Sequence, residues 1–346
     1  MLAPTVQCSA YARVGILGNP SDGYGGRGLS STIHNYSATA VLVPSPSQLM
    51  VGSLLLVPDL NQVEAYVRKN GYPNPVEGGD GTNLLLATIV VFVQAAVLLP
   101  PTPHELSLQV STTVPRQVGL AGSSAICTAV FRALMTWSGA TFSPSVVAHH
   151  VFLAESRELG IACGMQDRVA QAFDCAVEMD FALNKYTSVE PVLVHQHWFL
   201  LFPPAQTACL VKTSGGVHLP IKQRWLDGDA EVISKMQSIA ALVPLGTKCL
   251  ADKDWHGLAS LMNQNFDLRL DLFGLGGVAE QDWKVIQLAR SFSHQNPQVG
   301  VGCKLPGSGG CVLALLVDCT NPQAFVDYLE REGGVKVERI KPPPQQ

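Results

Sequence analysis

The sequence predicts a protein of the α+β class with two domains, and three observations lead to this prediction. The chain has 346 residues, which suggests about two domains at ~150 residues each. Hydrophobic residues make up 47% of the chain and charged residues only 14%. That balance allows large buried cores and excludes a disordered or fibrous protein. Segments typical of strands and of helices alternate along the chain.

Charge and cysteine content narrow the choice of partner and compartment. The formal net charge is −4 and no run of Lys or Arg occurs, so the basic face typical of nucleic-acid binding is not indicated. The nine cysteines form no C-x-x-C motif, and several lie in apolar runs, as reduced thiols of a cytosolic protein do. The first residues, MLAPTVQCSAYARV, do not have the pattern of a secretory signal. We therefore expect a cytoplasmic protein whose partner is a small molecule or another protein.

The first third of the chain indicates strands, one short helix and one long apolar helix. Strands are expected at residues 11–17, 34–43 and 105–114. The segment QVEAYVRKNG has the pattern of a short helix that Gly71 ends. Residues 84–99 are the most apolar stretch, but these 16 residues include Gln94 and fall short of the ~20 that span a bilayer. We therefore expect a buried core helix there and no membrane helix.

Residues 115–126, PRQVGLAGSSAI, lead directly into an apolar helical pattern and have two interpretations. Ser123 and Ser124 are good helix N-cap residues, and a capped helix would need nothing more. Gly119 and Gly122 would also expose backbone N–H groups at the positive end of a helix, which is an arrangement that binds phosphate. The lysine of the G-x-x-x-x-G-K-[ST] loop is missing. The segment alone leaves both interpretations open.

The rest of the chain defines the predicted domain boundary. Pro144 opens a helix that we expect to end before Gly160, and a strand-like segment, CAVEMDF, follows. The pattern changes after about residue 190, where β-type segments, long helices and a glycine turn in CKLPGSGGCVLALL make up the second half. We predict one domain over residues 1–190 and a second over residues 191–340.

Three polar residues are candidates for chemistry. Asp22 lies in a glycine-rich loop and could accept hydrogen bonds from sugar hydroxyls, although an Asp-Gly hairpin turn would explain it equally well. The G-x-G-x-x-G in that loop is not a dinucleotide motif, because the next segment is a strand and no acidic residue follows until Asp59. Glu155 and Asp167 lie near glycine turns and could act as a base or as ligands of Mg²⁺, which prefers oxygen. Solvated surface carboxylates are the alternative for both.

Taken together, the motifs resemble those of a known family. R-V-x-x-x-G-x-x-x-D (residues 13–22), P-x-x-x-G-L-x-G-S-S-A (residues 115–125) and G-x-G-G (residues 307–310) look like the three signature motifs of the GHMP kinases. CGMQD, which ends at Asp167, resembles the segment that carries the catalytic aspartate of that family. The resemblance spans nearly the whole chain. It implies an N-terminal domain of β-α-β units with a left-handed connection and a ferredoxin-like C-terminal domain.

Within the family, NPSDGYGGR, ELGIACGMQDRVAQ and LMNQNFDLR look like segments of the plant-type glucuronokinases. Galactokinases have Glu-His-Thr-Asp where this chain has Asn19-Pro20-Ser21-Asp22, which argues against galactose. The implied reaction converts ATP and D-glucuronate into ADP and glucuronate 1-phosphate, for UDP-glucuronate synthesis. The alternatives are a kinase for galacturonate or another sugar, and a non-catalytic protein of the same fold that senses sugar and ATP.

The resemblance also implies a role for each matching residue. Asp167 would accept the proton of the anomeric hydroxyl, and Arg13 would lie beside it and keep it ionised. Ser124 and Glu155 would hold Mg²⁺. The ATP phosphates would lie against Gly119, Leu120, Ala121, Gly122, Ser123, Ser124, Ala125, Gly307, Ser308 and Gly309. The sugar would contact Asp22, Arg27 and Arg168. A guanidinium matches the geometry of a carboxylate, so the residues expected to bind the uronate carboxylate are Arg27, Arg116 and Arg168.

Overall fold

The chain forms two compact units that interleave along the sequence. A computed structural model describes residues 5–44, 50–51, 54–55, 60–73, 81–96, 106–204, 214–274 and 278–343. The first unit comprises Met1–Ala12, Tyr36–Val114 and Ala121–Asp174, and the second comprises Arg13–Asn35, Pro115–Leu120 and Cys175–Gln346. Two long strands, β1 (Val6–Leu17) and β2 (Arg27–Pro44), belong to one unit at one end and to the other unit at the other end. The predicted contiguous domains, residues 1–190 and 191–340, stay a prediction.

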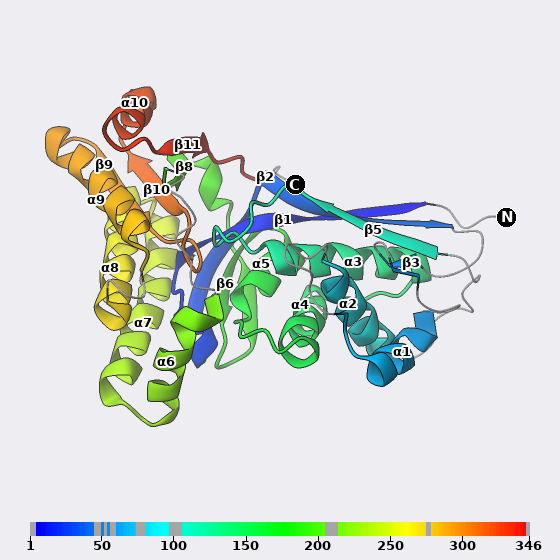
Figure 1. The fold of residues 1–346 in the computed structure, drawn as a ribbon. Helices are drawn as coiled ribbons and strands as arrows, with labels where there is room; N and C mark the ends of the chain where they lie inside the picture. The colour runs from blue at the N-terminus through cyan, green and yellow to red at the C-terminus, as the bar shows by residue number, and fades with distance from the viewer. Residues whose placement is uncertain are drawn as a thin grey trace. The chain divides into compact units, whose positions relative to one another are not determined.

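The first unit is a sheet with helices on one face (Figure 1). Residues 38–44 of β2 pair antiparallel with β5 (Leu106–Thr112), β5 pairs parallel with β3 (Met50–Val51), and β3 pairs antiparallel with β4 (Leu54–Leu55). The helices of this unit are α1 (Val63–Asn70), α2 (Thr82–Ala95), α3 (Gly122–Ser138), α4 (Pro144–Leu153) and α5 (Gln166–Phe173). A π-helical turn over Ala154–Glu158 continues α4.

Local sequence signals explain where these helices begin and end. Helix α2 is apolar on all sides and buried from Leu85 to Phe92, which confirms the predicted core helix; residues 97–99 of that prediction lie outside the described residues. Helix α1 ends at Gly71, as predicted, because φ there is +77°, a conformation that costs glycine little. Helix α4 begins at Pro144, and the hydroxyl of Ser143 caps it by accepting a hydrogen bond from the Val146 N–H.

The second unit contains two groups of strands. Residues 27–31 of β2 pair with β6 (Ala176–Asp180), which pairs with β7 (Lys185–Ser188). A separate four-stranded antiparallel sheet has the order β11-β8-β10-β9. Its strands are β8 (His197–Phe202), β9 (Gly300–Lys304), β10 (Val312–Val317) and β11 (Lys336–Arg339).

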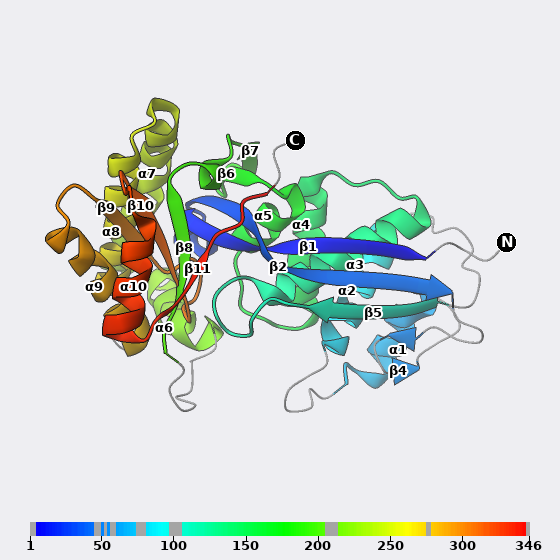
Figure 2. The same ribbon diagram turned by 90° about the horizontal axis from the view of Figure 1, so that it is seen from above.

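The helices of the second unit complete a ferredoxin-like arrangement (Figure 2). They are α6 (Ser214–Leu226), α7 (Ala230–Asp252), α8 (Trp255–Phe273), α9 (Glu280–Gln295) and α10 (Pro322–Gly333). Among the described residues, four helices lie between β8 and β9, and α10 lies between β10 and β11, so the chain follows the β-α-β-β-α-β pattern. Side chains from α8, α9 and α10 form one core with the sheet. The predicted α+β class is confirmed.

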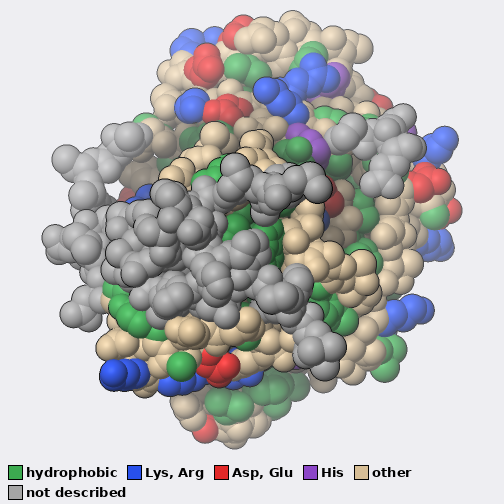
Figure 3. Space-filling view, turned by 90° about the vertical axis from the view of Figure 1, so that its right-hand side faces the viewer, with side chains coloured by type: hydrophobic (Ala, Val, Ile, Leu, Met, Phe, Trp, Pro, Cys, Tyr) green, Lys and Arg blue, Asp and Glu red, His purple; other side chains and the backbone are tan. Residues whose placement is uncertain are grey.

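Two general properties of the surface and the helices bear on the expected partners. In the described part of the chain, no helix combines the length and apolar character needed to cross a membrane. On the face drawn in Figure 3, Lys and Arg side chains lie interspersed with Asp and Glu side chains. The predicted absence of a nucleic-acid partner stays a prediction.

Candidate functional site

Two glycine-rich segments of the second unit lie against each other. They are the loop Pro115–Leu120 and the turn at residues 307–310, which joins β9 to β10. A Cβ added to Gly119 would lie 2.9 Å from the Gly309 carbonyl oxygen, and one added to Gly310 would lie 2.5 Å from the Gln117 carbonyl oxygen. Gly119 and Gly310 also have φ of +70° and +91°. Only glycine meets both conditions, so this contact explains why the two segments carry glycine.

Two buried arginines bind the carbonyl groups of these segments. Arg13 Nη1 donates to the Gly119 carbonyl at 2.8 Å and to the Pro306 carbonyl at 3.0 Å. Arg269, on α8 and only 2% exposed, donates from Nη1 to the Gly307 carbonyl at 2.7 Å and from Nη2 to the Ser308 carbonyl at 3.2 Å. Two guanidinium charges therefore lie at the paired loops and make the site favourable for an anion. That Arg13 lies beside Asp167 stays a prediction.

Asp282 of α9 holds the glycine turn at its other end. Its Oδ2 accepts a hydrogen bond of 2.8 Å from the Gly310 N–H, and the side chain is almost fully buried. Burial raises the pKa of Asp282 to about 6, although the Gly310 N–H and the Arg269 charge act in the opposite direction. Sequence reasoning missed both Arg269 and Asp282, because each lies far along the chain from the segment that it holds. The signal that could have found them is a charged residue at a helical position whose neighbours at the same spacing are apolar and buried.

The loop that contains Asp22 is held by α8 of the same unit. The Oδ1 of Asn265 accepts from the Gly18 N–H at 2.8 Å, and its Nδ2 donates to the Asn19 carbonyl at 3.1 Å. Asp22 lies in a 3-10 turn over Ser21–Tyr24, so a two-residue Asp-Gly hairpin turn is not what joins β1 to β2. Arg27 forms an ion pair with Asp180 at 2.9 Å.

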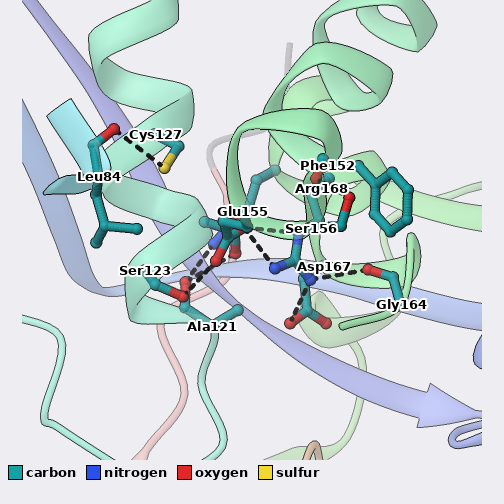
Figure 4. Close-up of polar contacts among 12 residues, drawn as sticks. Leu84, Ala121, Ser123, Cys127, Phe152, Glu155, Ser156, Gly164, Asp167 and Arg168 are labelled. Atoms are coloured by element: carbon teal, nitrogen blue, oxygen red, sulfur yellow. Dashed lines mark hydrogen bonds and ion pairs between the residues drawn. The ribbon is translucent and has the colours of Figure 1, made fainter. Parts of the chain in front are cut away.

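In the first unit, four predicted site residues come together at the start of α3 and α5 (Figure 4). Ser123 Oγ donates to Glu155 Oε1 at 2.7 Å. Arg168 Nε donates to Glu155 Oε2 at 2.8 Å, and Nη2 donates to the same oxygen. Arg168 Nη1 donates to the Gly164 carbonyl at 2.8 Å and lies 3.5 Å from Asp167 Oδ2. The result is a connected chain of polar groups that runs from the first turn of α3 to Asp167.

The serines do not cap α3, so that interpretation of the sequence is wrong. The N-cap residue is Ala121, which has a left-handed backbone (φ +63°) and makes no side-chain capping bond. The hydroxyl of Ser123 is directed to Glu155 instead, and Ser124 Oγ lies 3.3 Å from the Ala121 carbonyl. Of the two serines, only Ser123 has a hydrogen bond to Glu155 in the described part of the chain.

The three charged residues of this cluster, Glu155, Asp167 and Arg168, differ in how far they are exposed to solvent. Glu155 is 0% exposed and Arg168 is 3% exposed, so each charge depends on the other. Burial lowers the pKa of the Arg168 guanidinium, but Glu155, with smaller effects of Cys163 and Asp167, more than offsets this and holds that pKa above its usual value. The Asp167 side chain is 24% exposed and lies in the first turn of α5. Asp167 is therefore the most accessible of the three charged residues, whereas Arg168 is bound to Glu155 and Gly164.

The chain is similar to known proteins over most of its length. Residues 83–174 match the family model described as the GHMP kinases N terminal domain. The chain is 34% identical over 336 residues to glucuronokinase 1 of Arabidopsis thaliana, which covers 94% of this chain and 88% of that protein. It is 35% identical over 345 residues to probable glucuronokinase 2 of the same plant, over 96% of this chain and 90% of that protein. Lactococcus lactis galactokinase, solved with galactose, has a similar fold, with a TM-score of 0.76 and 15% identity over 98% of this chain and 93% of that chain.

The buried pair of Arg168 and Glu155 makes a testable contribution to stability. We expect Arg168→Met to lower the free energy of unfolding by about 3–5 kcal/mol, because it leaves the Glu155 charge buried and unpaired. In the double variant with Glu155→Gln, the loss should be smaller than the sum of the two single losses. Urea titration of the three variants measures both effects. The control is Arg331→Met, which removes an exposed arginine paired with Glu332 and should change little. Additive losses would show that the two charges do not depend on each other.

The raised pKa of Asp282 predicts a dependence of stability on pH. The Asp282 carboxyl binds its proton more tightly in the folded protein than in the unfolded chain. The contribution of Asp282 to stability therefore falls as pH rises from about 4 to about 6. Asn in place of Asp can still accept the Gly310 N–H and carries no charge. We therefore expect the unfolding free energy of Asp282→Asn, relative to the unaltered protein, to increase between pH 4 and pH 7. A difference that stays constant across this range would contradict the assignment.

Proposed function

We propose that this chain, which belongs to the GHMP kinase family and is an ATP-dependent sugar kinase, transfers the γ-phosphate of ATP to the anomeric hydroxyl of D-glucuronate. The observation that carries the proposal is the identity of 34–35% with two proteins named as glucuronokinases over almost the whole chain. The product, glucuronate 1-phosphate, is the form of the sugar from which UDP-glucuronate can be made. We place this reaction in the cytoplasm.

The paired glycine loops are our candidate for the nucleotide site. Residues 119–125 and 307–309 would hold the phosphates of ATP with backbone N–H groups. Three observations support this: the close approach of the two segments, the buried charges of Arg13 and Arg269, and the start of α3 at Gly122. A helix N-terminus that follows a glycine-rich loop suits phosphate by both its N–H groups and its dipole.

Asp167 is our candidate for the catalytic base. To catalyse phosphoryl transfer, a protein mainly has to position the reactants and stabilise the charge of the transition state. Asp167 is the charged residue of its cluster that solvent reaches, and Arg168 Nη1, held by Glu155, lies 3.5 Å from its Oδ2. The carboxylate would accept the proton of the sugar hydroxyl as the phosphoryl group arrives. Arg13 would orient Asp167, and Asp22 and Arg27 would contact the sugar.

The residues next to the phosphate loop fit Mg²⁺ in their chemistry. A hydroxyl oxygen and a carboxylate oxygen, Ser123 Oγ and Glu155 Oε1, lie 2.7 Å apart in the first unit. Among the described residues, no group of three or more His, Cys, Asp or Glu side chains could hold a metal. Mg²⁺ in kinases takes one or two carboxylates together with substrate phosphates. When bound, it neutralises charge on the transferred phosphoryl group. We propose Glu155 with Ser123, in place of Ser124, as the protein ligands.

Turnover with different sugars tests the substrate. With Mg-ATP, we expect coupled ADP release to be fastest, by kcat/KM, on D-glucuronate among glucuronate, galacturonate, galactose, glucose and mevalonate. Asp167→Asn should lower kcat by about 10²–10⁴, because it removes the base, while the thermal unfolding midpoint stays close to that of the unaltered protein. A higher kcat/KM on another sugar would replace glucuronate as the substrate. ATP binding without turnover on any sugar would favour a sensor.

Two neighbouring serines allow a matched test of the metal ligands. Ser123→Ala should raise the Mg²⁺ concentration that gives half-maximal rate by roughly tenfold or more, because it removes the hydroxyl at Glu155. Ser124→Ala should change that concentration much less, since its hydroxyl is directed to the Ala121 carbonyl. The measurement is a Mg²⁺ titration at saturating ATP and sugar. If Ser124→Ala has the larger effect, the assignment of Ser123 is wrong.

A further inference from the structure

A lysine of the second unit lies against the loop that contains Asp22. Lys222, on α6, donates from Nζ to the Gly23 carbonyl at 2.5 Å. The same ammonium lies 4.8 Å from the ring centroid of Tyr24 and 4.7 Å from that of Trp225. These two rings meet edge to face with their centroids 5.7 Å apart. The backbone carbonyl and the two rings therefore fix the position of the Lys222 charge.

The Lys222 charge has no carboxylate in ion-pair contact among the residues that the structure describes. Burial lowers the pKa of Lys222, and the charge of Asp22 on the same 3-10 turn acts in the opposite direction. A half-buried ammonium with one carbonyl partner retains two N–H donors. A cation held in this way favours an anionic ligand, because a carboxylate oxygen would replace the hydrogen bonds to water that the ammonium loses on burial.

The turn beside Lys222 has open space at two of its glycines. A Cβ added to Gly23 or to Gly25 would meet no atom within 4 Å, so this side of the turn is open. The Tyr24 hydroxyl is buried and has no hydrogen-bond partner in the described part of the chain. A buried hydroxyl without a partner is unfavourable, and a ligand oxygen would satisfy it. The turn thus brings an ammonium, a hydroxyl and the Asp22 carboxylate into one region.

The arginines predicted from the sequence are less suited to a substrate carboxylate. Arg27 is paired with Asp180 at 2.9 Å. Arg168 is buried and bound to Glu155 and Gly164. Arg116 lies on the loop Pro115–Leu120, whose neighbours are the glycine turn that we assign to the nucleotide. Lys222 differs from Arg27 and Arg168 because no protein carboxylate pairs with it among the described residues.

We propose that Lys222 binds the carboxylate of the sugar substrate and so selects a uronic acid over a neutral sugar. This inference rests on the proposed function, because it concerns the acceptor of the same reaction. The Asp22 carboxylate accepts hydrogen bonds from ring hydroxyls, and the Lys222 ammonium pairs with the carboxylate at C6. The Tyr24 hydroxyl, which has no hydrogen-bond partner among the described residues, would donate to the same anion. No bond forms or breaks at Lys222, which makes it a specificity-determining residue.

The test compares D-glucuronate with D-glucuronamide, which has the same ring and a neutral carboxamide in place of the carboxylate. In Lys222→Met, which keeps an unbranched side chain over the two rings, we expect kcat/KM for glucuronate to fall about 10- to 100-fold, the effect of losing one charged hydrogen bond. The kcat/KM for glucuronamide should change less than about threefold, because that substrate carries no charge for the lysine to pair with. Lys222→Arg should retain more of the preference for glucuronate than Lys222→Met does.

Controls separate this inference from the proposed function. Lys284→Met removes an exposed lysine of α9 that pairs with Glu280, and it should leave both substrates unchanged. Equal losses on both substrates in Lys222→Met and in Lys222→Gln would show a structural role and overturn the inference. An unchanged preference for glucuronate in Lys222→Met would also overturn it. Turnover of glucuronate by the unaltered protein tests the function itself, and its absence would overturn the function together with the role of Lys222.

Discussion

The contact between two glycine-rich segments is the constraint on which the second unit depends. Residues 117–120 and 307–310 approach each other so closely that a side chain at Gly119 or Gly310 would meet a carbonyl oxygen. Backbones this close need their polar groups satisfied, and the carbonyls of Gly119 and Gly307 receive hydrogen bonds from Arg13 and Arg269. Glycine allows the approach, and the buried arginines hold it in one geometry. The contact gives a physical reason why the two glycine-rich segments occur together in this chain.

In the first unit, the consecutive residues Asp167 and Arg168 have different electrostatic roles. Asp167 and Arg168 are neighbours on α5, and a helix turns by about 100° per residue, so their side chains leave the helix in different directions. Arg168 enters the core and neutralises Glu155, while Asp167 stays at the surface. A buried carboxylate without a partner would be unfavourable by several kcal/mol. The arginine therefore provides a partner for an acidic side chain next to the first turn of α3, where Ser123 contacts it.

In the second unit, several buried or half-buried basic side chains are bound by backbone carbonyl groups. Arg13 and Arg269 are bound to backbone carbonyls, and Lys304, which is fully buried, donates to the carbonyls of Gly15 and Leu305 and to Asn19. Lys222 is held by a carbonyl and two aromatic rings. Carbonyl dipoles fix the position of a cation without cancelling its charge. The unit thus places several basic side chains near the loops, although the chain as a whole carries a net charge of −4. The reaction proposed above, between ATP and a sugar acid, has two anionic substrates, and this distribution would suit both.

Local signals in the sequence determined the secondary structure around the site and the identity of its loops. Apolar periodicity, Gly71 and Pro144 predicted α2, the end of α1 and the start of α4, and the glycine motifs predicted which segments form the loops. These features depend on residues close together in the chain, where backbone preference and hydrogen bonding decide the outcome.

The partners of the loops depend on tertiary packing. Arg269 lies 38 residues from Gly307 in the sequence, and Lys222 lies 199 residues from Gly23. A local sequence pattern does not indicate contacts between residues so far apart in the chain. The choice between Ser123 and Ser124 was also decided by packing, because only the rotation of α3 relative to the turn at Ala154–Glu158 determines which hydroxyl meets Glu155.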